Sequence, residues 1–137
     1  MGRILGVDYG DSRIGLALSD PLKMIASPFK TIRNEGNEKC LHSLKAIINE
    51  NEVEAVVVGL PIGMKGQETA QTKKVREFAD SLSVLNLPIY LEDERLSSVS
   101  AEKSMIIQKI KTGHNKGMID QRAAAILLQQ FLDKQNR

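Results

Sequence analysis

The chain has 137 residues, of which 42% are hydrophobic and 26% charged, as is ordinary for a globular protein. Its formal net charge of +2 is too small to predict nucleic-acid binding by itself, so such binding would need local basic patches. The single cysteine, Cys40, excludes an internal disulfide, and we expect neither a signal peptide nor a membrane span. The expectation is one cytoplasmic domain covering residues 1–137.

The first part of the chain predicts three strands joined by short turns. Arg3 to Tyr9 is nearly continuous in apolar residues, as in a strand covered on both faces. Gly10 to Ser12 has turn chemistry, and Ile14 to Ser19 follows closely enough to form a hairpin. A third strand, about Ile25 to Ile32, contains Pro28, which places it at a sheet edge or at a bulge.

The pattern then alternates between helix and strand. Apolar residues repeat at helical spacing from about Asn37 to Asn51, and the β-branched run Glu54 to Leu60 is typical of a covered parallel strand. After the loop Pro61 to Gly66, a helix ends before Asn86. Leu87 to Leu91 is the next predicted strand.

Two more helices complete the predicted order βββαβαβαα. The first contains Val99 and Ile110 and breaks at Thr112 to Gly117, and the last begins near Met118. Strands reached through a helix should run parallel with right-handed connections. We therefore expect an α/β fold with a mixed five-stranded sheet, three antiparallel strands followed by two parallel ones, flanked by helices.

Carboxylates lie at the ends of several predicted elements. Asp8 closes the first strand, Asp93 and Glu94 close the strand PIYLEDE, and Asp120 lies in the first turn of the last helix. Ligand sites of open sheets form beyond the carboxyl ends of parallel strands. Carboxylates that converge there repel one another unless a hard cation such as Mg²⁺ or Mn²⁺ lies between them. Such ions activate water for phosphodiester cleavage.

Each of these acidic residues also has an ordinary explanation. Asp8 can be a turn residue, and Asp93 and Glu94 can be solvated charges before a helix. Asp120 near a helix N-terminus is favoured by the helix dipole whatever its function. Strand alternation puts Asp93 on one face and Glu94 on the other, and we favour Glu94 as the ligand while leaving Asp93 open.

Basic residues around this acidic centre are candidates for phosphate contacts. In the loop GLPIGMKGQET, Gly63 and Gly66 predict a flap that presents Lys65, although the pattern is not a P-loop. Scattered basic residues are otherwise the normal solvated surface. The candidates for binding substrate phosphates are Arg13, Lys65, Arg95 and Lys116, with Lys73, Lys74 and Lys111 as further possibilities.

Four motifs together resemble one known family over essentially the whole chain. They are GVDYGDSRIGLALSD, VVVGLP, DERLSS and KGMIDQRAAAILLQQFL, in the order and approximate spacing of the YqgF-type pre-16S rRNA nucleases, also described as Holliday-junction-resolvase-like proteins. The resemblance implies an RNase H-like fold related to the resolvase RuvC. It also implies metal-dependent phosphodiester cleavage, with a role in maturing the 5′ end of 16S rRNA. The acidic positions of the family correspond to Asp8, to Asp93 and Glu94, and to Asp120. The resemblance further implies structured RNA or branched DNA as the partner, and we expect a monomer or a homodimer.

Two other classes of function remain as alternatives. One is the ATP-binding actin-like and sugar-kinase lineage, whose first phosphate loop also consists of a strand, an aspartate, a glycine turn and a second strand. The length of this chain argues against that class, because its architecture needs two lobes with the nucleotide between them. The other is a non-catalytic module that binds nucleic acid or a partner protein. The acidic positions speak against such a binder, because they repel nucleic acid.

Overall fold

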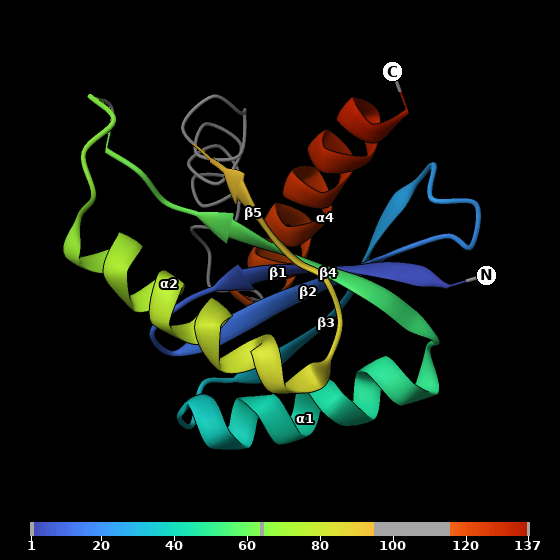
Figure 1. Cartoon of the computed structure of the whole chain (residues 1–137), viewed down its shortest axis with the longest axis horizontal. Helices are drawn as coiled ribbons and strands as arrows, with labels where there is room; N and C mark the ends of the chain where they lie inside the picture. Colours follow the sequence, from blue (N-terminus) through green and yellow to red (C-terminus); the bar gives the residue numbers. More distant parts are fainter. Residues whose placement is uncertain (1, 64, 95–115, 137) are drawn as a thin grey trace.

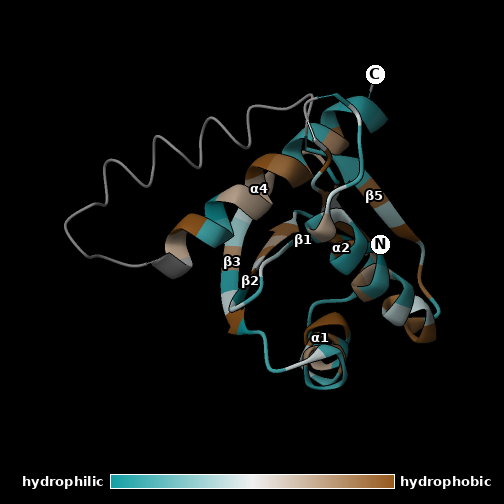
Figure 2. Cartoon of the chain, turned by 90° about the vertical axis from the view of Figure 1, so that its left-hand side faces the viewer, coloured by the Kyte–Doolittle hydropathy of each residue, from teal (hydrophilic) through white to brown (hydrophobic). Residues whose placement is uncertain are grey.

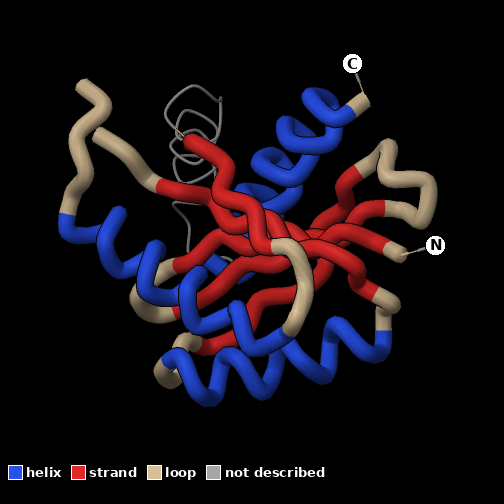
Figure 3. The backbone as a smooth tube through the Cα atoms, viewed as in Figure 1, coloured by secondary structure: helices blue, strands red, loops and turns tan. Residues whose placement is uncertain are grey.

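A computed structural model describes residues 2–63, 65–94 and 116–136 of the chain. These residues form a five-stranded sheet with helices on both faces (Figures 1 and 3). The strands are β1 Arg3–Tyr9, β2 Arg13–Ser19, β3 Ala26–Arg33, β4 Val53–Leu60 and β5 Ile89–Asp93. The helices are α1 Asn37–Glu50, α2 Ala70–Ser81 with the 3₁₀ turn η1 Leu82–Leu85, and α4 Lys116–Gln135.

The strand order is β3-β2-β1-β4-β5, which confirms the predicted mixed sheet. β2 pairs antiparallel with β1 and β3, whereas β4 pairs parallel with β1 and β5. The prediction for Pro28 is confirmed on both counts, because β3 is an edge strand and is bulged there. Leu16 lies opposite Lys30 but Ala17 lies opposite Pro28, so Phe29 is the extra residue.

Two hydrophobic layers cover the sheet. Leu5, Val7 and Val58 face α1 and α2 in one core, which includes Leu44 and Phe78. On the other face, Ala55 and Val57 pack against α4. Figure 2 shows α1 nearly end-on, brown on the side toward the sheet and teal on the side away from it. The two faces of β1 and β4 are thus both buried, as their continuous apolar sequences predict.

Small residues let α4 lie close to the sheet. Ala123 and Ala124 are fully buried against the strands. A Cβ atom added at Gly6 of β1 would lie 2.8 Å from Leu128 Cβ and 3.1 Å from the carbonyl oxygen of Ala124. The backbone of α4 is therefore nearly in contact with the central strand.

Both ends of β5 differ from the prediction by two residues. β5 begins at Ile89 rather than Leu87, because Pro88 has no N–H and offers only its carbonyl, which accepts from Val56 N at 3.0 Å. β5 then continues to Asp93, two residues beyond the predicted end. The helix predicted around Val99 and Ile110 lies outside the described residues. No described helix is long and apolar enough to cross a membrane.

Candidate active site

β1, β4 and β5 run parallel, so their carboxyl ends lie together at one end of the sheet, on the left in Figure 1. The turn between β1 and β2 and the loop between β4 and α2 lie at the same end, because each continues from one of these strands. The predicted acidic residues Asp8, Asp93 and Glu94 are thus at the end where ligand sites of parallel sheets form.

Asp8 is a buried carboxylate on the α4 face of β1. Its neighbours Val7 and Tyr9 pack in the opposite core, so strand alternation turns Asp8 toward α4. Only 6% of the residue is exposed. Asp8 lies directly opposite Gly15 of β2. Asp8 is thus a buried residue of the strand and not part of the exposed turn that follows it.

Asp120 is brought next to Asp8 by Gly15. A Cβ atom added at Gly15 would lie 2.1 Å from the carbonyl oxygen of Asp120 and 2.7 Å from its Cβ. α4 begins at Lys116, before the predicted start near Met118, so Asp120 lies in its second turn and not in its first as predicted. Only glycine at position 15 leaves space for the helix backbone here. Because Gly15 is the cross-strand partner of Asp8, the two aspartates are neighbours on one face of the sheet.

Glu94 approaches from the other side of Asp8, above Gly59 of β4. A Cβ atom added at Gly59 would lie 2.6 Å from Glu94 Oε1, which is buried, and 2.9 Å from Leu127 Cδ2. Gly59 follows Val58, the parallel partner of Val7, so it lies beside Asp8. Glycine again provides the space that the carboxylate occupies.

The carboxylates of Asp120, Asp8 and Glu94 therefore lie on the α4 face of the sheet, at the carboxyl ends of β1 and β4. They are spread over three neighbouring strands. Asp120 lies above β2, Asp8 belongs to β1 and Glu94 lies above β4. Adjacent strands are about 4.8 Å apart, so the set extends over roughly 10 Å. Asp93 is the exception, because alternation along β5 turns its side chain toward the α2 face. The geometry favours Glu94 over Asp93 as the third member of the set.

Arg13 is the cation of this group. Its Nε donates to Asp120 Oδ2 at 2.8 Å, with 40% of the arginine side chain exposed. Among the described residues, no three acidic, histidine or cysteine side chains are gathered closely enough to hold a metal ion. The donor chemistry fits a hard divalent cation, because all three side chains are carboxylates. Asp120 is instead neutralised by Arg13.

Of the other predicted phosphate-binding residues, the structure describes some and not others. Lys65 is exposed in the loop between β4 and α2, where its N–H donates to Gln67 Oε1 at 3.0 Å. Gly66 has a φ of +84°, as its place in this turn requires. Lys116 is the first residue of α4. Arg95 and Lys111 lie outside the described residues.

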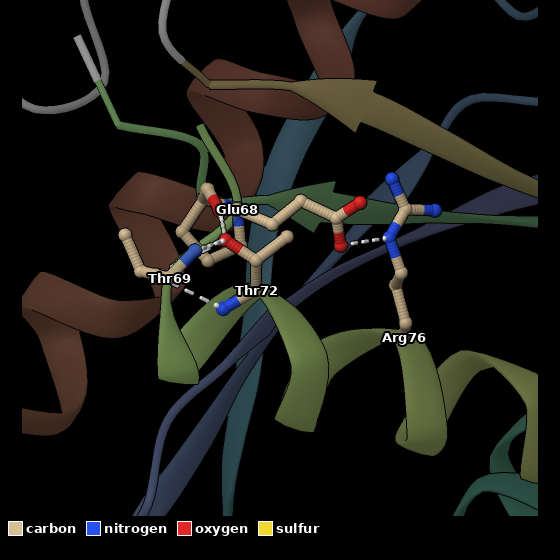
Figure 4. A network of polar contacts seen from close by, with 5 residues as sticks. Glu68, Thr69, Thr72 and Arg76 are labelled. Carbon is tan, nitrogen blue, oxygen red and sulfur yellow. Dashed lines mark hydrogen bonds and ion pairs between the residues drawn. The ribbon is translucent and has the colours of Figure 1, made fainter. Parts of the chain in front are cut away.

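The loop that carries Lys65 is attached to the N-terminus of α2 by a threonine pair (Figure 4). Thr69 Oγ1 accepts from Thr72 N at 3.2 Å, and Thr69 N donates to Thr72 Oγ1 at 2.9 Å. The buried Thr72 hydroxyl also donates to the carbonyl of Pro61, at the start of the loop. Arg76 Nε donates to Glu68 Oε1 at 2.7 Å. Both ends of the loop are thereby held to one helix start.

Two acidic residues outside this set have structural roles. Asp20 Oδ1 accepts from Ile25 N and Met24 N, each at 2.8 Å, and these bonds lower the pKa of its carboxyl group. Asp11 pairs with Lys74 at 3.4 Å in exposed positions. Both lie outside the strands, in the connections that follow β1 and β2.

Sequence reasoning missed three residues that shape the site. Gly15 and Gly59 stand in the middle of apolar strands, and an isolated glycine in a strand is itself a signal of close backbone approach. Glu92 of β5 is buried, with 5% of the residue exposed, and it is held by Gln130 and Lys134 of α4. Strand alternation separates Glu92 from Asp93, but no sequence pattern distinguishes Glu92 from Glu94, which lies on the same face.

Comparisons with known proteins place the chain in a family. A family model described as RuvX, Holliday junction resolvase, matches residues 2–134. The chain is 44% identical over 135 residues to a "Putative pre-16S rRNA nuclease" of Roseiflexus sp., covering 98% of this chain and 96% of that one. A protein of the same description from Clostridium kluyveri is 41% identical, with 96% and 97% covered.

Solved resolvases share the fold at much lower identity. Thermus thermophilus RuvC in complex with a Holliday junction substrate has a TM-score of 0.59 at 16% identity, covering 99% of this chain and 96% of that one. The fowlpox virus resolvase with Holliday junction DNA has a TM-score of 0.60 at 12% identity, with 98% and 99% covered. Full-length family matching, together with the RuvC-like sheet, shows that the chain belongs to the RuvX family, also called the YqgF-type pre-16S rRNA nuclease family.

Proposed function

We propose that this protein is a divalent-metal-dependent nuclease that hydrolyses phosphodiester bonds at the 5′ end of precursor 16S rRNA in the cytoplasm. The observation that carries the proposal is the placement of Asp8, Glu94 and Asp120 on one face at one end of the sheet, with glycines beneath two of them. Membership of the RuvX family supports the same reaction class.

Each residue of the site has a role in this proposal. Asp8, Glu94 and Asp120 hold Mg²⁺ or Mn²⁺, which when bound supplies an activated water and stabilises the leaving oxygen. Asp120 leaves its contact with Arg13 or shares its carboxylate with it. Arg13, half exposed at the rim, and Lys65, exposed on the loop, contact phosphates on either side of the cleaved bond.

The relatives favour RNA over branched DNA as the substrate. The proteins that are 41–44% identical over almost the whole chain carry a pre-16S rRNA nuclease description. The resolvases solved with Holliday junctions share the fold at 12–16% identity, which does not carry substrate preference. Cleavage of a Holliday junction is the alternative, in keeping with the description of the family model.

The test is cleavage of two substrates by the purified protein with Mg²⁺ or Mn²⁺. We expect precursor 16S rRNA to be cut near its mature 5′ end and a four-way DNA junction to be left intact. Cutting of the junction alone would replace the RNA assignment with the resolvase alternative. A folded protein that binds RNA equally well with and without its acidic residues, and cuts neither substrate, would establish a non-catalytic binding module.

Matched variants identify the residues that act. Asp8→Asn and Glu94→Gln should each lower cleavage by more than the roughly 10- to 100-fold that altering an outer-shell partner costs. Asp11→Asn, three residues from Asp8 and paired with Lys74, should cut like the wild type. Asp93→Asn should also remain active, because its side chain faces away from Asp8. Equal cleavage by Asp8→Asn and the wild type would refute the proposal.

A further inference from the structure

Glu92 is a buried carboxylate that the proposed reaction does not use. It lies two residues before Glu94, on the same α4 face of β5, and opposite Gly59 of β4. Only 7% of its side chain is exposed. Such a charge is kept in a folded protein when it is paired and hydrogen-bonded. Its partners therefore indicate what it does.

Two side chains of α4 converge on one oxygen of Glu92. Lys134 Nζ donates to Oε2 at 2.8 Å, and Gln130 Nε2 donates to the same atom. Gln130 Nε2 also lies 3.5 Å from the carbonyl oxygen of Asp93, the residue immediately before Glu94. We refer to Glu92, Gln130 and Lys134 as the clamp. It joins the C-terminal half of α4 to the end of β5.

The clamp and Gly15 seat α4 at two places on the sheet. Near its N-terminus, in its second turn, α4 rests on Gly15 and carries Asp120. Gln130 is ten residues further along the helix, about 15 Å away at 1.5 Å per residue. β5 is an edge strand that pairs only with β4 within the described sheet, so the clamp ties its end to the helix. A rigid helix held at both places sets the separation of Asp120 from Glu94.

We infer that Glu92 is a positioning residue of the active site, acting through Gln130 and Lys134 to hold Glu94 at the right distance from Asp120. The inference rests on the proposed function, because it concerns the geometry of the carboxylates that hold the metal. We assign no ligand role to Glu92, whose Oε2 accepts hydrogen bonds from both Lys134 and Gln130. Displacement of a ligand by a fraction of an ångström weakens metal binding without removing any ligand.

The charge of Lys134 provides the sharpest test, because the residue is half exposed and its substitution leaves the core filled. Lys134→Met removes the charge, and Lys134→Arg keeps it. We expect Lys134→Met and Glu92→Gln to need about tenfold more Mn²⁺ for half-maximal thermal stabilisation and for half-maximal cleavage. Lys134→Arg should stay within about twofold of the wild type in both measurements.

A matched control breaks an ion pair elsewhere. Glu54→Gln removes the pair between Glu54, near the start of β4, and Lys23 in the loop before β3, at the end of the sheet opposite the carboxylates. It should lower the melting temperature in metal-free buffer without changing the Mn²⁺ midpoint. The KM for RNA should be unchanged in all four variants, because none of them alters Arg13 or Lys65, the proposed phosphate contacts.

Two outcomes would overturn the inference, and they are distinguishable. If Lys134→Met lowers the metal-free melting temperature but keeps the wild-type Mn²⁺ midpoint, the clamp is a stability element only, while the proposed nuclease function stands. If the folded wild type is neither stabilised by Mn²⁺ nor active, the proposed function fails and the positioning role fails with it. Should Glu92→Gln not fold, the Lys134 pair alone decides between these results.

Discussion

Two strand glycines, Gly15 and Gly59, leave the space that Asp120 and Glu94 occupy. Gly15 and Gly59 have no structural requirement for an unusual backbone conformation, since neither has a positive φ. Each instead leaves the volume of one Cβ atom to a residue from another element, Asp120 or Glu94. Glycine in a strand interior costs stability, and this cost is understandable where a site is built on it.

Gly15→Ala should therefore destabilise the protein. Replacing glycine with alanine at a compatible position raises the free energy of unfolding by about 0.4–1 kcal/mol, because it reduces the conformational entropy of the unfolded chain. Here the new Cβ would lie 2.1 Å from backbone oxygen, and overpacking of this kind costs roughly 1–3 kcal/mol, so the clash outweighs the gain. We expect a net loss in the free energy of unfolding, measured by urea denaturation.

Gly63→Ala is the comparison for this prediction. Its Cβ would meet the Gln67 side chain at 2.2 Å, but an amide at the end of a flexible side chain can move aside, whereas the α4 backbone cannot. Gly63→Ala should cost less than Gly15→Ala. The reverse order would mean that α4 does not rest on β2 as described.

At the level of elements, α2 is the anchor of the loop that presents Lys65. The reciprocal bonds between Thr69 and Thr72 satisfy two N–H groups that would otherwise have no helical partner. Because Thr72 also bonds to Pro61, the cap holds the end of β4 as well as the helix. The first turn of α2 and the loop should lose order together.

Thr69→Ala should lower the free energy of unfolding by about 1 kcal/mol, and Thr69→Ser should lower it little, because serine keeps the capping oxygen. Guanidinium denaturation of both variants measures the difference. If the loop positions Lys65 on substrate, Thr69→Ala should also raise the KM for RNA more than Thr69→Ser does. Equal stability of the two variants would contradict the capping role.

At the scale of the whole molecule, the site exists only when the sheet and α4 are assembled. Asp8 and Asp120 lie far apart in the sequence and meet through the packing of α4 on β2. A metal ion bound by both, and by Glu94, therefore binds the folded state and not the unfolded chain. Binding of this kind stabilises the fold by mass action.

We accordingly expect Mn²⁺ at a hundred times its dissociation constant to raise the free energy of unfolding by about 2.7 kcal/mol. Thermal unfolding with and without Mn²⁺ measures the effect. Asp8→Asn should abolish it, and Asp11→Asn should retain it. A full Mn²⁺ effect in Asp8→Asn would show that the ion binds elsewhere on the protein.

Much of this architecture follows from local patterns in the chain. The near-continuous apolar runs from Arg3 to Tyr9 and from Glu54 to Leu60 predict covered strands, and helical spacing predicts α1 and α2. Pro28 predicts the bulged edge. These features depend on backbone geometry and side-chain periodicity within a few neighbouring residues, which is why they are readable without a structure.

The composition of the site depends on contacts between distant parts of the chain. Alternation along β5 separates Asp93 from Glu94, but only the position of Gly59 shows which of them lies beside Asp8. The pairing of Arg13 with Asp120, and of Glu92 with Lys134, likewise joins residues whose proximity no local pattern encodes. Strand order and helix packing decide which faces meet. Sequence analysis therefore identifies the candidate carboxylates, whereas the tertiary structure determines which of them lie together on one face of the sheet, because strand order and helix packing join distant parts of the chain.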